Sequence, residues 1–233
     1  QYGHISLIFG TDGSPLSKRN GSRSVQDLRE QGFLPTAVVN YLARLGHYYK
    51  DDSFMSLDNL SKQFATVHLS KSPARFDESQ LLHWQKEAIQ HAEHDDLWEW
   101  MRTHVKEHVA LERSSDFVET VKANIIFPED AKTWAQAIFS EQLELSHESK
   151  EIIKQAGMEF FEQTLEGLSN FGTDFKEVTN HVKQQTGAKG KGLFMPLRIA
   201  LTGEQHGPEM VKILPLMGVE KAKQRIEAAI YSI

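Results

Sequence analysis

The segment Leu16-Ser17-Lys18-Arg19-Asn20-Gly21 places two adjacent cations in a stretch rich in small residues. Small residues let the backbone come close to a ligand, and Lys and Arg neutralise phosphate oxygens. Lys18 would act as a compact charge, whereas Arg19 would make a forked contact. These residue types favour a phosphate-binding loop formed by Leu16, Ser17, Lys18 and Arg19. On composition alone, a solvated surface loop explains the same triplet.

A second cationic segment spans residues 187–203, where Lys189 and Lys191 alternate with glycines and Arg198 follows. Its spacing fits neither the dinucleotide-binding nor the Gly-Lys-Ser/Thr fingerprint, so a nucleotide-binding glycine loop is rejected. Arg198 can donate to a base edge or a phosphate. It can equally hold the segment to a backbone carbonyl or a carboxylate, and the residues alone do not separate these two roles.

A third pair of cations, Lys71 and Arg75, flanks Pro73 just before Asp77. They can face a nucleic-acid backbone, where phosphate contacts set orientation without reading sequence. Pro73 and Asp77 can also simply begin a helix. Both functions fit the same residues.

Metal chemistry is not indicated. His91 with His94, and His104 with His108, can share helix faces, but no third ligand accompanies either pair and there is no His-Glu-x-x-His motif. The chain contains no cysteine. We therefore expect no metal site and no zinc in this part of the protein.

These candidate residues are positioned by helices more than by strands. Ile5–Phe9 predicts one strand that ends at a turn, and because a lone strand cannot bury itself we expect it to be the last strand of a larger sheet. Hydrophobic periodicity predicts helices elsewhere, with Pro128, Pro196 and Pro208 near three of the starts. The expected helical ranges are 35–46, 56–64, 77–91, 95–109, 115–126, 128–143, 147–169, 174–186, 196–202, 207–217 and 219–231.

Aromatic residues in the middle of the chain can stack on nucleobases, but at helical spacing they more often form core, and we expect core. They are Trp98, Trp100, Phe117, Phe127 and Trp134.

The order of motifs resembles that of class I glutamyl-tRNA synthetases. That family has an apolar strand, Gly-x-Asp-Gly, Leu-Ser-Lys-Arg-His-Gly, Ser-Val, an acidic helix, Gly-Tyr/Phe-Leu-Pro and Ala-x-x-Asn-Tyr-Leu-Ala-x-Leu-Gly. The chain shows the same order in Gly10-Thr11-Asp12-Gly13, Leu16 to Gly21, Ser24-Val25, Gly32-Phe33-Leu34-Pro35 and Ala37 to Gly46. Residues 70–77 resemble the family's stem-contact element, and residues 190–208 resemble its anticodon-binding motif. Asn20 replaces the usual His, and Gln85-Lys86-Glu87 replaces the usual Leu-Asn-Gly.

The resemblance implies a mostly α chain. It would contain the edge of a Rossmann-type catalytic domain in residues 1–24, a stem-contact fold in residues 25–92 and an all-helical anticodon-binding region in residues 93–233. The chain would thus be the carboxy-terminal part of an ATP-dependent aminoacyl-tRNA ligase. The first class I signature, His-Ile-Gly-His, does not occur in these 233 residues. We therefore expect the chain alone not to activate glutamate.

The resemblance also implies partners and roles. The parent enzyme would attach glutamate to tRNA(Glu) through glutamyl-adenylate, with ATP and Mg²⁺, and Lys18 would stabilise the ATP phosphates. Lys71, Arg75, Lys189, Lys191 and Arg198 would contact the tRNA. Two alternatives stay open: a non-catalytic helical module that binds protein or tRNA, and a relaxed-specificity synthetase that also charges tRNA(Gln).

Composition limits the remaining classes. The net charge of −6 argues against a general nucleic-acid coat protein, although the positive charge gathers at the two ends and the middle is acidic. No apolar run reaches the ~20 residues of a membrane span. The absence of cysteine fits a reducing compartment. We expect a cytoplasmic monomer with no membrane partner.

Overall fold

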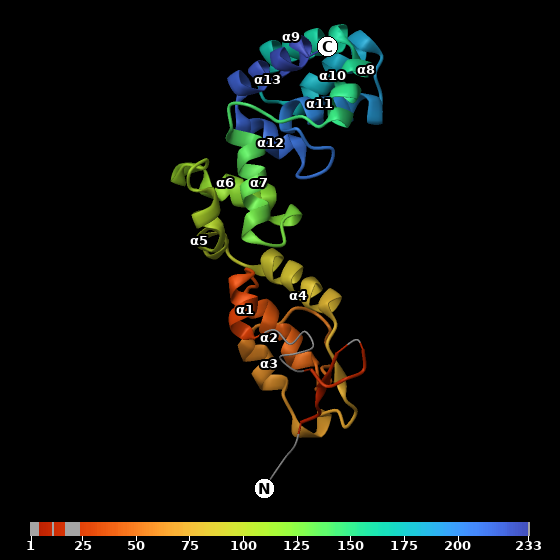
Figure 1. Cartoon of the computed structure of the whole chain (residues 1–233). Helices are drawn as coiled ribbons and strands as arrows, with labels where there is room; N and C mark the ends of the chain where they lie inside the picture. Colours follow the sequence, from red (N-terminus) through yellow and green to blue (C-terminus); the bar gives the residue numbers. More distant parts are fainter. Residues whose placement is uncertain (1–4, 11, 17–23, 233) are drawn as a thin grey trace. The chain divides into compact units, whose positions relative to one another are not determined.

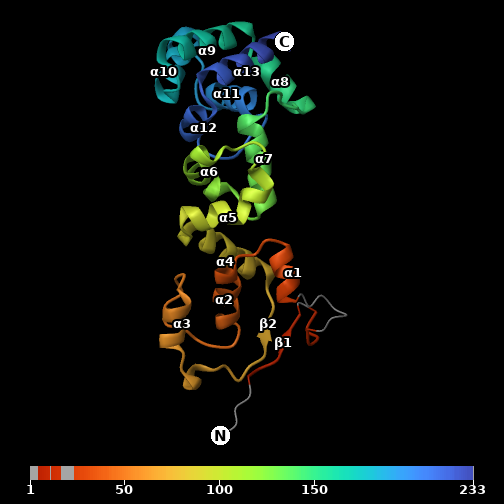
Figure 2. The same cartoon turned by 90° about the vertical axis from the view of Figure 1, so that its left-hand side faces the viewer.

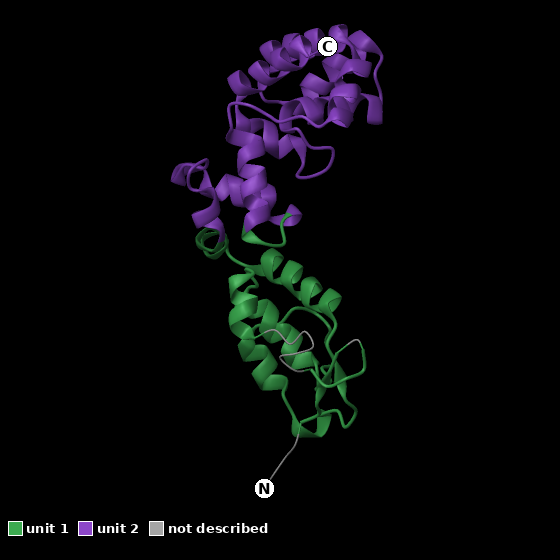
Figure 3. Cartoon of the chain, viewed as in Figure 1, with its two compact units in different colours: residues 1–100, 125–128 green, residues 101–124, 129–233 purple. Residues whose placement is uncertain are grey.

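The computed structural model describes residues 5–10, 12–16 and 24–232. Within these residues the chain is mostly helical and contains one two-stranded sheet, which confirms the predicted fold class. No helix in the described part is long and apolar enough to cross a membrane. The chain divides into two compact units, residues 1–100 with 125–128 and residues 101–124 with 129–233, which Figure 3 shows in two colours.

Unit 1 begins with a strand and continues with helices (Figure 1). Its elements are β1 (Ile8–Phe9), α1 (Val25–Glu30), α2 (Pro35–Arg44), α3 (Leu57–Gln63), the 3-10 turn Thr66–His68, β2 (Ala74–Arg75), α4 (Glu78–His91) and the first half of α5 (His94–Val105).

The sheet of unit 1 is small. β1 is parallel to β2, with Ile8 opposite Ala74 and Phe9 opposite Arg75. The predicted strand over residues 5–9 therefore survives only as Ile8–Phe9. Its partner was not predicted from the sequence, because a strand of two residues has no alternation to detect.

Helices α2 and α4 lie side by side in both views and form the core of unit 1 (Figures 1 and 2). Pro35 occupies the first turn of α2, as predicted, where its missing N–H leaves no bond unmade. The buried apolar residues of this core are Leu28, Phe33, Ala37, Val38, Tyr41, Leu81, Trp84 and Ala88.

Gln85 is fully buried at one end of this core. Its Oε1 accepts from the Leu34 N–H at 2.9 Å, and its Nε2 donates to the carbonyls of Ile126 at 2.8 Å and Gly32 at 3.2 Å. This residue starts the segment that departs from the family pattern. The departure therefore has a structural role, because the Gln85 amide bonds to three backbone groups that are remote from it in the sequence.

Unit 2 is helical throughout its described residues. It contains the end of α5, the 3-10 turns Leu111–Arg113 and Lys122–Asn124, α6 (Ser114–Val121), α7 (Pro128–Phe139), α8 (His147–Ala156), α9 (Met158–Phe171), α10 (Phe175–Thr186), α11 (Lys191–Thr202), α12 (Met210–Met217) and α13 (Val219–Tyr231). Helix α9 packs against α10 and α13, and α11 packs against α8 and α13 (Figure 2).

Two helix boundaries in unit 2 were predicted wrongly. The range 147–169 is two helices, because Gly157 takes a left-handed φ of 82° between α8 and α9. Pro196 does not begin a helix but lies inside α11, which begins five residues earlier at Lys191. The pattern rule failed there because Gly190, with φ 51°, turns the chain upstream of the proline.

Candidate functional site

The loop with the two adjacent cations leaves the sheet at β1. The Leu16 N–H donates to the Ile8 carbonyl at 2.9 Å, which holds Leu16 beside the strand. The turn before it is closed by Asp12, whose carboxylate accepts from the Ser14 N–H at 3.0 Å. This hydrogen bond lowers the pKa of Asp12. Ser17, Lys18 and Arg19 lie outside the described residues, so their predicted contacts with phosphate stay predictions.

The two cations of residues 70–77 lie on the surface of unit 1. Lys71 and Arg75 are both exposed, and neither side chain has a hydrogen-bond or ion-pair partner within the described residues. Arg75 belongs to β2, and it also lines a cavity of about 380 Å³ together with Arg44 and His83. Both side chains are thus available to a polyanion.

Two residues of the Asn-Tyr-Leu-Ala motif of α2 are buried and bond to the backbone of unit 1. Asn40 is buried, donates to the carbonyls of Thr36 at 2.9 Å and Met55 at 2.8 Å, and accepts from the Met55 N–H at 3.0 Å. The Tyr41 hydroxyl accepts from the Asp77 N–H at 2.7 Å, at the start of α4. Burial raises the pKa of Tyr41. Tyr41 therefore fixes the backbone two residues after Arg75, and Asn40 fixes the backbone at Met55.

Arg44, in the same motif, is also used within unit 1. Its guanidinium lies over the Trp84 ring at 4.0 Å from the centroid and donates to the Asn40 side chain at 2.9 Å and the Ser53 carbonyl at 2.6 Å. Burial lowers its pKa. Both terminal nitrogens of Arg44 are bonded within unit 1, so the guanidinium stabilises α2 against α4.

The turn between α10 and α11 presents the second pair of cations. Gly187, with φ 73°, ends α10 in the left-handed conformation, and α11 begins at Lys191 with no side-chain cap. Lys189 and Lys191 are exposed and have no bonded side-chain partner in the described part of the chain. The structure thus brings two free cations to one helix start, where the helix dipole adds partial positive charge.

Arg198 lies in α11 and points to the following loop. Its Nη2 donates to the Pro208 carbonyl at 2.9 Å, so the loop-holding role considered from the sequence is present. Its Nη1 is buried and has no partner within the described residues. Burial lowers its pKa. A contact of Arg198 with RNA stays a prediction.

The loop after α11 rests on an aromatic ring. Gly207 has φ 142°, and a Cβ added to it would lie 1.9 Å from Cη2 of Trp134. Trp134 itself is only 8% exposed. The loop of residues 203–209 therefore packs against the Trp134 ring at Gly207. This contact keeps Pro208 within hydrogen-bonding distance of Arg198.

The other aromatic residues of the middle region are also packed, which confirms the core prediction. Trp98 and Phe117 are buried, and Phe127 meets Phe33 edge to face at 5.1 Å between centroids. Trp100 is half-buried and donates from Nε1 to the Gly32 carbonyl at 2.9 Å. None of these five rings, Trp134 included, is free to stack on a base in this arrangement.

Arg225 is the residue that sequence reasoning missed. It is 5% exposed and donates to the carbonyls of Ala137, Ser140 and Leu201. Burial lowers its pKa to about 10. The sequence feature that could have revealed it is its position on α13 between the buried residues Ala222 and Ile226, where a cation needs hydrogen-bond partners. It links the ends of α7 and α11 and so supports the Arg198 region.

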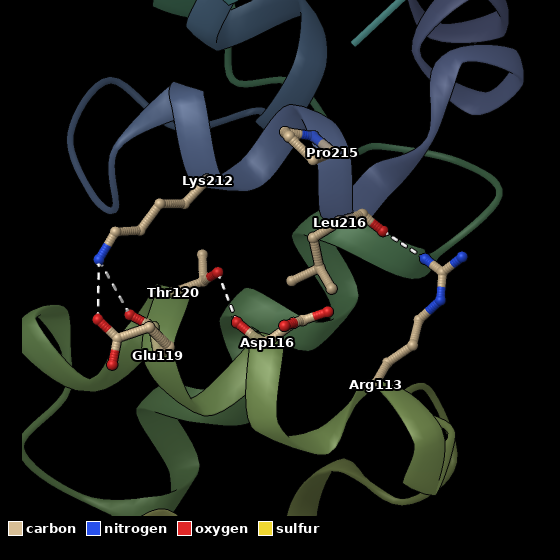
Figure 4. Close-up of a pocket in the computed structure, with 7 residues that line it drawn as sticks. All are labelled: Arg113, Asp116, Glu119, Thr120, Lys212, Pro215 and Leu216. Atoms are coloured by element: carbon tan, nitrogen blue, oxygen red, sulfur yellow. Dashed lines mark hydrogen bonds and ion pairs between the residues drawn. The ribbon is translucent and has the colours of Figure 1, made fainter. Parts of the chain in front are cut away.

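A mixed cavity of about 430 Å³ lies between α6 and α12 (Figure 4). Arg113 donates to the Leu216 carbonyl at 2.6 Å on one side, and Lys212 meets the Glu119 carboxylate at 3.1 Å on the other. Figure 4 shows these two bonds bridging the helices across the cavity. Both cations thus have a partner on the opposite side of the cavity.

The histidines do not gather metal ligands. His104 pairs with Glu129 at 2.9 Å, and this hydrogen bond lowers the pKa of Glu129. The His91 Nδ1 lies 2.8 Å from the Glu87 carbonyl oxygen. Within the described residues no group of three or more His, Cys, Asp or Glu side chains could hold a metal ion.

Two family models match the chain. Residues 1–84 match the catalytic domain of class I tRNA synthetases (E and Q), and residues 94–230 match the anticodon binding domain. The chain is 51% identical over 227 residues to glutamate–tRNA ligase 2 from Nitrosococcus oceani, covering 97% of this chain and 48% of that protein. It is 44% identical over 228 residues to glutamate–tRNA ligase 2 from Coxiella burnetii, covering 98% and 49%. The chain thus spans about half the length of the curated relatives it matches.

Two solved structures have a fold similar to that of this chain. A glutamate tRNA ligase from Elizabethkingia meningosepticum, in complex with its amino acid, matches with a TM-score of 0.82 at 24% identity, covering 98% of this chain and 51% of that one. A glutamate-tRNA synthetase from Elizabethkingia anophelis matches with a TM-score of 0.82 at 25% identity, covering 98% and 50%. At 24% identity the first of these shows the shared fold alone.

Proposed function

The chain belongs to the glutamyl-tRNA synthetase family, and from this premise we propose that it is the tRNA-binding part of a glutamate–tRNA ligase. The parent enzyme would attach glutamate to tRNA(Glu) through glutamyl-adenylate in the cytoplasm, acting as a monomer. This chain would bind the tRNA and supply the loop that neutralises the ATP phosphates. The observation that carries the proposal is a single similarity, at 51% identity, that runs through 97% of the chain.

The geometry supports tRNA binding at two places. In unit 1, Lys71 and Arg75 are exposed and unpaired within the described residues. In unit 2, Lys189 and Lys191 lie exposed at the start of α11, the helix that also carries Arg198. Phosphate contacts of this kind position an RNA, and we propose that Arg198 contacts a base or a phosphate beside its loop.

We propose that the domain division follows these roles, with catalytic, stem-contact and anticodon-binding parts in residues 1–24, 25–92 and 93–233. The matched family models support the last boundary, because one ends at residue 84 and the next begins at residue 94. The compact units divide a little later, after Trp100, since the end of α4 and the start of α5 pack with unit 1.

In the parent enzyme the proposed role of Lys18 is electrostatic. When glutamate attacks the α-phosphorus of ATP, negative charge spreads over the phosphates and pyrophosphate leaves, and a cation that closes on them lowers the barrier. Leu16, Ser17 and Arg19 would shape that loop. Mg²⁺ would arrive with ATP, since within the described residues no group of three or more His, Cys, Asp or Glu side chains could hold it.

The proposal predicts salt-dependent binding of tRNA(Glu) by this chain. Each phosphate contact contributes about 0.9 to the slope of log affinity against log salt. Changing both Lys189 and Lys191 to Gln should therefore reduce the slope by about 1–2 and weaken binding at low salt. Fluorescence anisotropy with a labelled tRNA(Glu) transcript, between about 50 and 200 mM salt, measures this.

The matched control changes Lys150 and Lys154 to Gln, because both are exposed lysines of α8 in the same unit. It should leave the slope unchanged. Wild-type chain that binds tRNA(Glu) without any salt dependence, or not at all, would instead support the alternative of a protein-interaction module. A tRNA(Gln) transcript that binds as well as tRNA(Glu) would support relaxed specificity.

A further inference from the structure

One face of α11 combines charge with an exposed aromatic ring. Lys191, Phe194 and Arg198 follow one another at intervals of three and four residues, which places them on the same side of the helix. The opposite side, with Leu193, Leu197 and their neighbours, is buried. The three side chains therefore form a row that starts at the free lysine and ends at the Arg198–Pro208 contact.

Phe194 is 49% exposed, in contrast to the buried aromatic residues of the same unit. Within the described residues the ring meets one neighbouring ring, that of Phe175 on α10, at 6.4 Å between centroids and 40° between planes. Helices α10 and α11 pack against each other, so Phe175 supports Phe194 from one side. A large apolar ring that is half exposed, and that another ring supports on one side, is suited to stacking against a planar group of a partner.

The charge around this ring selects the partner. Residues 178–203 contain Lys183, Lys189, Lys191 and Arg198 but no Asp or Glu, within a chain whose net charge is −6. This segment covers most of α10 and all of α11. An exposed aromatic ring within a purely cationic segment is the combination that binds single-stranded nucleic acid, because phosphates meet the cations while a base stacks on the ring.

We propose that Phe194 is a stacking residue for one unpaired base of the bound tRNA, with Lys191 neutralising an adjacent phosphate. This inference rests on the proposed function and adds a base contact that it does not contain. The unpaired base belongs to the anticodon loop, since the family model over residues 94–230 is that of an anticodon binding domain. Stacking on an aromatic ring is tolerant of base identity, so Phe194 would add affinity while Arg198 is left to discriminate.

The test replaces Phe194 with Leu, which keeps apolar volume but removes the ring. Binding of an anticodon stem-loop RNA of tRNA(Glu) should weaken about 5- to 150-fold, the equivalent of about 1–3 kcal/mol for one stacked base. The slope of affinity against salt should stay at the wild-type value, because no charge is lost. The same RNA can carry the fluorescent base 2-aminopurine at single loop positions. Its fluorescence should be quenched when the wild type binds and should not be quenched when Phe194→Leu binds.

Two further variants keep the test interpretable. Phe194→Trp should bind as well as the wild type, since it restores a stacking surface. Phe171→Leu changes the other exposed phenylalanine of this unit, at the end of α9 and 41% exposed, and should bind within about twofold. Circular dichroism checks that every variant is folded.

The outcomes separate the two proposals. Wild-type chain that binds the stem-loop while Phe194→Leu binds equally well overturns the stacking inference and leaves the proposed function intact. Equal weakening in Phe194→Leu and Phe171→Leu also overturns it, because the effect would then not belong to this ring. Wild-type chain that does not bind the stem-loop contradicts both. A folded Phe194→Leu chain that keeps its affinity for the stem-loop RNA but loses binding to a protein would favour a protein partner for this ring. That result would also overturn the inference.

Discussion

Replacing Gly207 with Ala is expected to lower the free energy of unfolding by about 2–5 kcal/mol, because the new methyl group has no space and a left-handed φ strains any side chain. Its Cβ would lie 1.9 Å from Trp134 Cη2, and φ at this position is 142°. Either the Trp134 ring or residues 203–209 must move. Urea unfolding followed by circular dichroism measures the loss.

Gly187→Ala is the matched control for this effect. Gly187 also has a left-handed φ, 73°, but a Cβ added there meets nothing within 4 Å. It should cost only about 1–2 kcal/mol, the penalty of the backbone conformation alone. If Gly207→Ala is no more destabilising than Gly187→Ala, Trp134 does not hold the loop as described. Because the loop carries Pro208, Gly207→Ala should also weaken RNA binding more than Gly187→Ala.

Replacing Arg225 with Met is expected to lower the free energy of unfolding by about 3–5 kcal/mol. Met preserves most of the length of the side chain but donates no hydrogen bond. The carbonyls of Ala137 and Leu201 lie in the last turns of α7 and α11, where no helical N–H follows to satisfy them. Each would be left buried without its charged donor. Urea unfolding measures this loss as well.

The control for Arg225→Met is Lys223→Met, which removes the same charge from the same helix. Lys223 is half-buried on α13 and has no bonded side-chain partner within the described residues. Its replacement should change the free energy of unfolding by about 0.5 kcal/mol or less. Equal effects of the two changes would mean that Arg225 acts through net charge rather than through the three carbonyls.

Much of the helical architecture followed from local patterns. The helices predicted over residues 35–46 and 219–231 depend on neighbours within a few residues, and the structure confirms both as α2 and α13. The failures came from backbone conformation. Gly157 divides a continuous apolar pattern into α8 and α9, and Gly190 starts α11 well before Pro196. Periodicity carries no information on which glycine takes a left-handed φ.

The candidate site could also be predicted from the sequence only where its features depend on local residues. The exposure of Lys189 and Lys191 could be expected from a polar, glycine-rich segment. Partners remote in the sequence could not be expected. Gln85 bonds to Ile126, and Arg225 bonds to Ala137, across distances in sequence that no local pattern spans. Phe194 stood within a predicted tRNA-binding segment, but only its exposed ring singles it out.

The central claim is that unit 2 reads the anticodon loop of tRNA(Glu). The most direct test compares dissociation constants for a tRNA(Glu) transcript and for the same transcript with its three anticodon bases replaced, at one salt concentration. The account predicts that the altered transcript binds at least about fivefold more weakly, as expected from a lost base contact of about 1–3 kcal/mol. Equal affinity for the two transcripts, with the same dependence on salt, would contradict it.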